Sequence, residues 1–368
     1  MLNRLYRSKS FYLWSAVLLL LLIQTGHGRN RPSQDFLKSG RQALATGNYN
    51  QAEDYLRRAI DRVDAPDADT VLALGDLGNL LLIEGRMSEA ETMLDRAIGM
   101  VRLNRTLDQR QLPILLGALG NLYRKTRRFR ESEDTLKEAL QIGTKLLGDT
   151  SVHVADLYND LGVLHLTVGN TGKAKKDLKN ALSIIEKTVQ DSDQHLAGTL
   201  SNLSSVYFTE RKWSLAEPVM LRALHMVEQS LGPEHPDTWT LLSNLGVLYY
   251  AQGKFGDAET MHRRALTIQR RVFGTDNANT AASAANLAQV LVAVGMYGEA
   301  RTLFTEALET QEQILGKRVP EVAATLDQFA GLLRRTGNNG LAEEMENRAT
   351  SIRIENAFTV SVRKMRQR

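Results

Sequence analysis

The stretch SNLGVLYYAQGKFGDAETMHRRALTIQRRVFG, residues 243–274, decides the fold of this chain. Its apolar residues recur every three or four positions on both sides of a Gly-Lys-Phe-Gly turn that begins at Gly253. This spacing is typical of two amphipathic helices joined by a short turn. The stretch contains no catalytic motif, so it indicates architecture rather than chemistry.

Self-similar copies of this stretch fill most of the 368-residue chain, eight in all, with a step of 42 residues after a shorter first step of 38. Three columns of small residues mark the copies. The first column is Ala59, Ala97, Ala139, Ala181, Ala223, Ala265, Ala307 and Ala349. The second is Ala52, Ala90, Ser132, Ala174, Ala216, Ala258, Ala300 and Ala342, and the third is Gly40, Gly78, Gly120, Gly162, Ser204, Gly246, Ala288 and Ala330. Helix axes come within about 8–10 Å only where the contact residues are small. We therefore predict that each copy is a closely packed helix pair.

Residues that begin and end helices agree with this interpretation. The turn glycine at position 253 has counterparts at Gly47, Gly85, Gly169, Gly295 and Gly337, with Arg127 and Arg211 as the departures. Ser88 and Glu91 have the spacing of a capping box for a second helix. Left-handed caps are expected at Gly148, Gly232, Gly274 and Gly316. Pro218 is expected in the first turn of its helix, where a missing N–H is tolerated.

These residues resemble the tetratricopeptide repeat, in particular Leu245-Gly246, Tyr249, the Gly253 turn and Arg264-Ala265-Leu266. The 42-residue period and the segment LGPEHPDTWTLLSNLGVLYY, residues 231–250, are similar to the repeats of kinesin light chains and their bacterial relatives. The resemblance implies an all-α, right-handed superhelical solenoid of stacked antiparallel helix pairs over residues 33–357. It also implies a non-enzymatic scaffold that binds other proteins.

The two ends of the chain differ from the repeats. Residues 1–28 contain a basic start and an apolar run over residues 11–23, which is shorter than the roughly 20 residues of a membrane span. We interpret this segment as a signal peptide, so that the protein is exported to the periplasm or secreted, or as an uncleaved N-terminal anchor that tethers it to a membrane. Membrane contact is expected through this segment alone. Residues 358–368 form a basic tail.

Charge and composition exclude several classes of function. The chain has 46 basic and 42 acidic residues, but seven of the basic ones lie in the two ends, and the body is slightly acidic. We therefore expect no nucleic-acid partner. There is no cysteine, which excludes disulfides, thiolate metal sites and a cysteine nucleophile.

Chemistry-bearing residues form no recognisable catalytic set. The segment Gly169-Asn-Thr-Gly-Lys173 is too short for a phosphate-binding loop and is interpreted as a helix–helix turn. His153 and His195 lie one period apart without other metal ligands nearby, which favours polar helix starts over a metal pair. His165 is interpreted as a packed interior side chain. No catalytic, cofactor-binding or metal-binding residue is predicted, and the protein is not expected to be an enzyme.

The candidate binding residues lie on the first helices, which in the resembled family line the concave side of the solenoid. The position before the Leu-Gly pair holds Lys38, Asp76, Ala118, Asp160, Asn202, Asn244, Asn286 and Gln328. We call Asn202, Asn244, Asn286 and Gln328 the carboxamide row. A carboxamide offers an acceptor and two donors, which suits the N–H and C=O groups of an extended peptide. In related repeats asparagines at this place hold peptide backbones. The alternative is that these side chains bond to neighbouring helices or are solvated.

Further residues of the predicted surface lie near the row. Ser205 and Gln289 are expected one turn further on, and Phe208 and Tyr250 are expected to contact apolar side chains of a partner. In the first half, Asp76, Asp160 and Asn159 are expected to pair with Arg124 and Lys125.

The sequence thus predicts a scaffold or adaptor that binds an extended segment of a protein or peptide partner in the concave groove. One alternative is a self-associating assembly factor of the cell envelope, which would use exposed apolar ends of the repeat array. A second alternative is an envelope enzyme, a hydrolase or transferase with its site built into the repeats.

Overall fold

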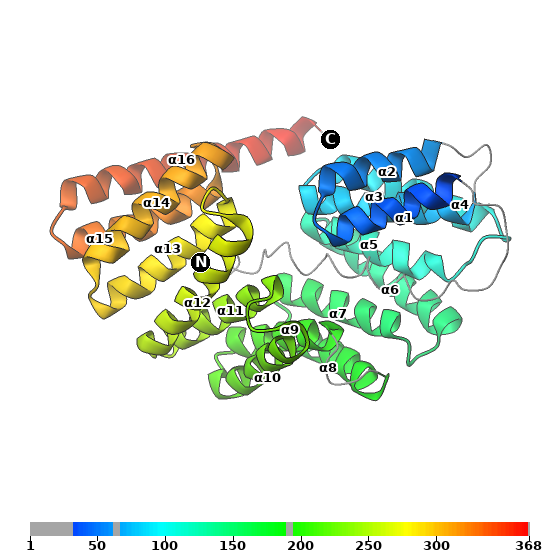
Figure 1. Cartoon of the computed structure of the whole chain (residues 1–368), viewed down its shortest axis with the longest axis horizontal. Helices are drawn as coiled ribbons and strands as arrows, with labels where there is room; N and C mark the ends of the chain where they lie inside the picture. Colours follow the sequence, from blue (N-terminus) through cyan, green and yellow to red (C-terminus); the bar gives the residue numbers. More distant parts are fainter. Residues whose placement is uncertain (1–31, 62–66, 189–193, 367–368) are drawn as a thin grey trace. The chain divides into compact units, whose positions relative to one another are not determined.

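A computed structural model describes residues 32–61, 67–188 and 194–366 of the chain, and helices are the only regular secondary structure in these ranges (Figure 1). The described helices fall into two compact units, with the boundary between Lys212 and Trp213. Unit 1 contains α1 (Pro32–Ala45), α2 (Tyr49–Asp61), α3 (Ala68–Glu84), α4 (Met87–Leu103), α5 (Gln111–Lys125), α6 (Phe129–Leu147), α7 (Val152–Thr167), α8 (Thr171–Thr188) and α9 (Gln194–Thr209). Unit 2 contains α10 (Trp213–Leu231), α11 (Pro236–Ala251), α12 (Phe255–Phe273), α13 (Ala278–Val294), α14 (Tyr297–Leu315), α15 (Pro320–Arg335) and α16 (Asn339–Arg366).

The three columns of small residues lie where the packing argument places them. All sixteen members of the first two columns, from Ala52 and Ala59 to Ala342 and Ala349, are 0% exposed. In the third column, a Cβ atom at Gly120 would lie 2.6 Å from Cγ of Leu136, and one at Gly162 would lie 2.6 Å from Cγ of Leu178. Only glycine allows these helices their close approach. The predicted all-α solenoid of helix pairs is confirmed for the described residues.

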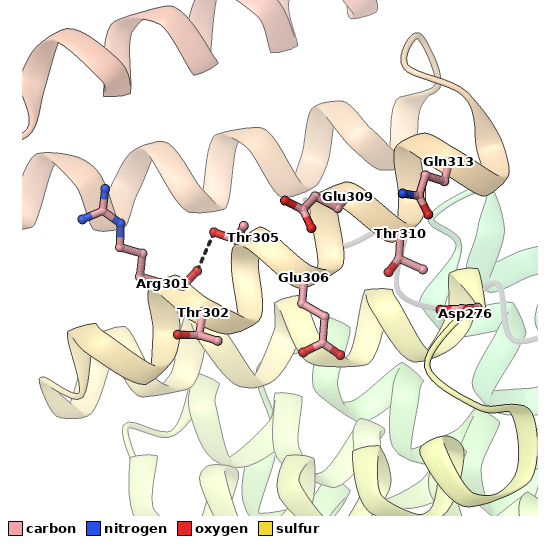
Figure 2. Close-up of a pocket in the computed structure, with 8 residues that line it drawn as sticks. All are labelled: Asp276, Arg301, Thr302, Thr305, Glu306, Glu309, Thr310 and Gln313. Carbon is pink, nitrogen blue, oxygen red and sulfur yellow. Dashed lines mark hydrogen bonds between the residues drawn. The ribbon is translucent and has the colours of Figure 1, made fainter.

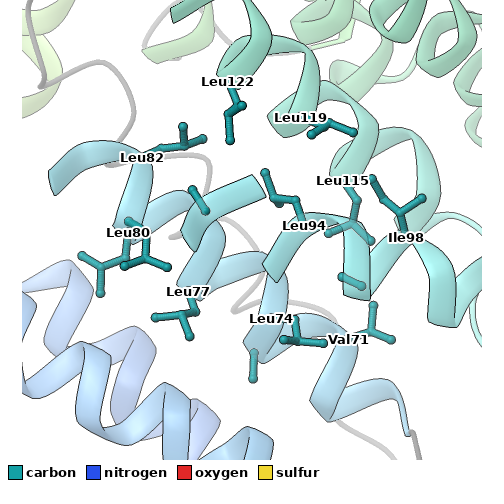
Figure 3. Packing of buried hydrophobic residues seen from close by; sticks show 14 of the residues in the cluster. Val71, Leu74, Leu77, Leu80, Leu82, Leu94, Ile98, Leu115, Leu119 and Leu122 are labelled. Carbon is teal, nitrogen blue, oxygen red and sulfur yellow. The ribbon is translucent and has the colours of Figure 1, made fainter. Parts of the chain in front are cut away.

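The helix pairs are held together by a continuous apolar core within each unit. In unit 1, Val71, Leu74 and Leu77 of α3 are buried together with Leu94 of α4 and Leu115 of α5 (Figure 3). Each second helix therefore packs between its own first helix and the first helix of the next pair. In unit 2, the rings of Phe304 on α14 and Phe329 on α15 stack with centroids 5.4 Å apart. The core thus runs between successive pairs, as nearest-neighbour stacking requires.

The turns within the helix pairs adopt left-handed backbone conformations, as the turn-glycine column predicts. Six of these positions are glycines with φ between 73° and 85°. The two departures adopt the same conformation without being glycine, because Arg127 has φ 66° and Arg211 has φ 56°. The chain geometry of the repeat, rather than the residue type, sets the backbone there.

Three predictions about helix ends are wrong. Helix α4 begins at Met87, and its N-cap Arg86 makes no side-chain cap, so Ser88 is already inside the helix and forms no capping box. Gly148, Gly274 and Gly316 have positive φ but extended ψ, between 156° and −178°, so they are not left-handed helical caps. Pro218 is the sixth residue of α10 and lies in its second turn. For Ser88 and Pro218 the helix starts earlier than expected, whereas at the three glycines the helix ends at the expected place and only the backbone conformation differs.

First and second helices form two layers within each unit. Successive first helices contact one another directly, α1 with α3, α3 with α5, α5 with α7, α7 with α9, and α13 with α15. Successive second helices are instead linked by long side chains, such as Arg102 with Glu138, Arg263 with Glu299 and Arg270 with Glu306. The closer spacing of the first helices places them on the concave side of each unit.

The two ends of the chain are predicted to lie outside the repeats. The predicted leader, residues 1–28, lies outside the described residues. The predicted basic tail starts within α16, which ends at Arg366. Among the helices of residues 32–61, 67–188 and 194–366, none is both long and apolar enough to span a membrane.

Candidate binding surface

The first helices of unit 2 carry three members of the carboxamide row. Asn244 on α11, Asn286 on α13 and Gln328 on α15 are all half-buried, so part of each side chain reaches the surface of its helix layer. Nε2 of Gln328 donates a hydrogen bond to Oε1 of Gln289 at 3.0 Å, which ties α15 to α13. Asn286 has no hydrogen-bond partner among the described residues. Its carboxamide is therefore available for a ligand.

Apolar side chains accompany the row on α11. The ring of Tyr250 is half-buried and packs edge-on against Phe255, with centroids 5.3 Å apart. This contact fixes the orientation of the tyrosine ring without covering it. The first-helix layer of unit 2 thus combines amide groups with an ordered aromatic side chain.

The remaining predicted residues lie on α9 in unit 1. Nδ2 of Asn202 donates to Oδ1 of Asn159 on α7 at 2.8 Å, and Asn202 is half-buried. Ser205 is only 1% exposed, and its hydroxyl donates to the carbonyl oxygen of Ser201. Phe208 is half-buried. Asn202 and Gln328 therefore bridge adjacent first helices and keep only part of their hydrogen-bonding capacity for a ligand, while Ser205 faces the interior.

The first half of the chain has a charged first-helix layer, but with different pairs from those predicted. Asp76 is buried and accepts a hydrogen bond from Nε of Arg41 at 2.6 Å. Burial raises the pKa of Asp76, and the charge and hydrogen bond of Arg41 oppose that rise. Lys125 donates a hydrogen bond to the backbone carbonyl of Leu82. The predicted pairing of Asp76 with Arg124 or Lys125 is wrong.

Asp160 is the acidic member of the same column on α7. Loss of hydration and, to a smaller extent, the neighbouring charge of Asp156 raise its pKa to about 7, against the opposing effects of a hydrogen bond from Asn121 and the charge of Arg124. Arg124 itself contacts the Asn121 carboxamide oxygen at 3.3–3.4 Å. Arg124 therefore affects Asp160 through its charge, which lowers the pKa of Asp160, and not through a hydrogen bond.

Histidines on the first helices are held by acids. Nδ1 of His195 on α9 lies 2.6 Å from Oδ1 of Asp156 on α7, and His153 lies 3.8 Å from the other oxygen of that carboxylate. The sequence predicts polar helix starts at the two histidines but carries no signal for their shared carboxylate. His165 is 6% exposed, as expected for an interior side chain, and its Nδ1 lies 2.6 Å from Oδ2 of Asp177. In the part of the chain that the structure describes, no group of three or more acidic or histidine side chains could hold a metal ion.

A separate hollow of about 610 Å³ lies on the second-helix side of unit 2 (Figure 2). Seven of its lining residues belong to α14, and Asp276 comes from the loop before α13. The lining is Asp276, Arg301, Thr302, Thr305, Glu306, Glu309, Thr310 and Gln313. The carboxylate of Glu306 is bonded to Arg270 at 2.7 and 2.8 Å. This polar hollow contains no histidine and has no connection to the carboxamide row.

Comparison with known protein families identifies the chain. Tetratricopeptide-repeat models match residues 37–104 and, in overlapping segments, residues 111–187 and 195–355. The chain therefore belongs to the tetratricopeptide-repeat family. No curated protein matches it significantly.

Solved structures with the same fold are distant in sequence. A putative kinesin light chain from Podosopora anserina with nearly identical repeats is 20% identical, with a TM-score of 0.47, covering 54% of this chain and 94% of the other. A signal transduction ATPase with a tetratricopeptide repeat sensor, from Pyrococcus horikoshii, is 14% identical, with a TM-score of 0.59, covering 97% of this chain and 54% of the other. A Rap protein complexed with competence and sporulation factor is 13% identical, with a TM-score of 0.55, covering 88% and 98%. At these identities the likeness concerns the fold.

Proposed function

We propose that the protein is a scaffold or adaptor that binds an extended protein segment along the first helices of unit 2. The observation that supports this most directly is the half-exposed Asn286 carboxamide, which lies between Asn244 on α11 and Gln328 on α15 in the repeat order and has no partner among the described residues. A carboxamide in this position can accept a backbone N–H and donate to a backbone C=O at once. Tyr250 on α11 is the apolar contact of this surface.

Family and fold support a binding role. Tetratricopeptide repeats are generally non-enzymatic interaction modules, and the fold is shared with a Rap protein that holds competence and sporulation factor.

The uncharged carboxamide row also indicates which part of the partner is recognised. Because Asn286, Gln289 and Gln328 offer amides rather than charges, we infer that the bound segment is recognised mainly through its backbone.

A peptide-display selection on the full chain tests this proposal. The selected peptides are then measured by fluorescence anisotropy against Asn286→Ala. We expect Asn286→Ala to weaken binding at least about tenfold, the loss of one to two hydrogen bonds to a polar backbone. Asn347→Ala is the matched control, because Asn347 is an exposed asparagine on the second helix α16. Equal binding by both variants, or no selected peptide, would refute the proposed surface.

Localisation follows from the N-terminal segment in this proposal. We infer that the protein is exported, or tethered to a membrane by residues 1–28. Intact mass measurement of the protein from its native host distinguishes the two. A mature chain starting near residue 29 indicates export with cleavage, and an intact N-terminus in the membrane fraction indicates a tether.

Self-association through the ends of the repeat array has little support in the described helices. The exposed residues of α1 include Gln34, Asp35 and Lys38, and those of α16 include Glu343 and Asn347 together with the apolar Ile354. Polar outer faces of this kind are typical of capping helices, which keep a solenoid from stacking on another copy.

A further inference from the structure

One interior position of unit 2 is polar without a hydrogen-bond partner. Gln269 on α12 is 0% exposed, and both its Oε1 and its Nε2 atoms are buried and unbonded. A buried carboxamide without partners is strongly unfavourable, so such groups are nearly always bonded to protein or to ordered water.

The repeat predicts which side chains surround Gln269. At the equivalent position three 42-residue steps earlier, a Cβ atom on Gly143 would lie 3.4 Å from Cβ of Pro113, 3.5 Å from Cγ2 of Val154 and 3.3 Å from Cδ1 of Leu157. The same steps lead from Gly143 to Gln269, and from its three neighbours to Trp239, Thr280 and Ser283. We call the meeting point of these four side chains from α11, α12 and α13 the Gln269 junction.

The residues around Gln269 carry further unbonded polar atoms. Nε1 of Trp239 and Oγ1 of Thr280 are buried and have no hydrogen-bond partner. Trp239 is 9% exposed, Thr280 1% and Ser283 5%. By equivalence with the surroundings of Gly143, these four buried polar side chains from three helices are expected to meet away from solvent.

The equivalent junction one period before Gly143, in unit 1, is apolar and contains no unbonded polar atoms. One period before Gly143, the junction consists of Val101, Val71, Leu112 and Leu115, all buried. One period after Gln269, the buried carboxamide of Gln311 does have a partner, because its Oε1 accepts a hydrogen bond from Oγ1 of Thr325 at 2.7 Å. The Gln269 junction therefore combines a buried carboxamide with a donor-only indole and a hydroxyl, and none of these atoms is bonded.

We propose that the Gln269 junction is an internal binding site for ordered water. Water suits this set because it accepts from the indole N–H of Trp239, donates to Oε1 of Gln269 and exchanges hydrogen bonds with the hydroxyl of Thr280. Buried waters typically make two to four such bonds. The proposal does not depend on the peptide-binding surface.

The indole of Trp239 provides a direct test in the full chain. The chain has three tryptophans, Trp14, Trp213 and Trp239, so labelling with [15N]tryptophan gives three indole signals, which Trp239→Phe assigns. We expect the Trp239 N–H to show NOE and ROE cross peaks to water of opposite sign, the signature of water that tumbles with the protein. Absence of these cross peaks at Trp239 would overturn the proposal.

Two variants separate bound water from other causes. Gln269→Val introduces the residue type found at Val101 and should abolish the water cross peaks of Trp239 while the Trp213 signal stays unchanged. Gln311→Val is the matched control, because that carboxamide is already bonded to Thr325, and it should leave the cross peaks intact. Thr280→Val removes a hydroxyl that could relay magnetisation from bulk solvent. Persistence of the cross peaks in Gln269→Val would contradict a water held by the carboxamide, and their persistence in Thr280→Val would show that they do not arise by relay through the hydroxyl.

Discussion

At the residue scale, the size of the third-column side chain sets how closely the two helices of a pair approach. Gly246 is the tightest case, because a Cβ atom there would lie 2.5 Å from Nε2 of His262. Other pairs have a leucine opposite the glycine, as in Leu94 over Gly78. The planar histidine ring is rigid and 2% exposed, so it cannot move aside.

We therefore expect Gly246→Ala to lower the free energy of unfolding by about 1–3 kcal/mol through overpacking. The matched control is Gly256→Ala, since no atom lies within 4 Å of a Cβ at that exposed position in α12. This control should stabilise the protein slightly, because alanine favours helix over glycine. Urea unfolding measures both, and equal stability of the two variants would contradict the packing argument.

His262 also makes stability depend on pH. Burial lowers its pKa to about 4, compared with about 6.5 for an unfolded histidine. The unfolded state then binds a proton more readily than the folded state, so stability is complete above about pH 6.5 and is lost as pH falls toward 4. We expect the free energy of unfolding to fall by on the order of 2 kcal/mol more in the wild type than in His262→Leu between pH 7.5 and pH 5. Parallel pH profiles of the two proteins would show that His262 is not the group responsible.

Two arginines, Arg127 and Arg211, adopt the left-handed backbone conformation that the repeat requires at its turn. Arg127 is exposed and has φ 66° at a position that is glycine in most copies. A non-glycine residue in this conformation costs about 1–2 kcal/mol, and the extra chain entropy of glycine offsets part of it. We expect Arg127→Gly to stabilise the protein by about 0.5–1 kcal/mol. Thermal melts of Arg127→Gly and Arg130→Gly provide the comparison. Arg130 lies inside α6, so Arg130→Gly should destabilise the protein.

At the element scale, repeat spacing predicts which segments are helical but not where each helix begins. The difference is clearest in α10, where Pro218 lies in the second turn rather than the first. A proline there cannot donate the hydrogen bond to the carbonyl of Ser214, and its ring crowds that carbonyl. Ser88 shows the same offset in α4, which begins before the residue expected to cap it.

Replacement of Pro218 with alanine should relieve this strain. The side chain is exposed, so no packing is lost, and we expect the free energy of unfolding to rise by about 1–2 kcal/mol, less than the full helix penalty because proline also restricts the unfolded chain. Chemical denaturation of Pro218→Ala provides the measurement. Leu221→Ala, at an exposed site one turn further along, serves as the control for altered helix propensity. A destabilised Pro218→Ala would show that the proline is accommodated without strain.

The 42-residue period does not predict the hydrogen bonds between neighbouring first helices. Small-residue columns identify partners within a helix pair because those partners keep a fixed separation in every copy. Hydrogen bonds between pairs follow the rotation from one pair to the next, which the columns do not encode. Asn202 accordingly bonds to Asn159, 43 residues away, and Gln328 to Gln289, 39 residues away, rather than to residues one period distant. The position of the carboxamide row was predictable, whereas its partial engagement with neighbouring helices was not.

At the scale of the whole molecule, each unit is a stack in which a helix pair contacts only its neighbours. The stability of such a stack is approximately a sum of pair stabilities and interface terms, so a local defect should act locally. The two tryptophans among the described residues, Trp213 and Trp239, both belong to unit 2. In a Trp14→Phe background, tryptophan fluorescence therefore reports on unit 2, whereas circular dichroism reports on helices throughout the chain.

This difference between probes tests whether the units unfold separately. Leu94 in unit 1 is 0% exposed, and Leu94→Ala should cost about 2–5 kcal/mol through the cavity that it leaves. We expect this variant to lower the urea midpoint measured by circular dichroism, while the fluorescence midpoint stays unchanged. Phe304→Ala, which removes a fully buried ring from unit 2, should instead lower the fluorescence midpoint. A fluorescence midpoint that falls with Leu94→Ala as far as the dichroism midpoint would mean that the stack transmits a defect over many pairs and unfolds as one cooperative body.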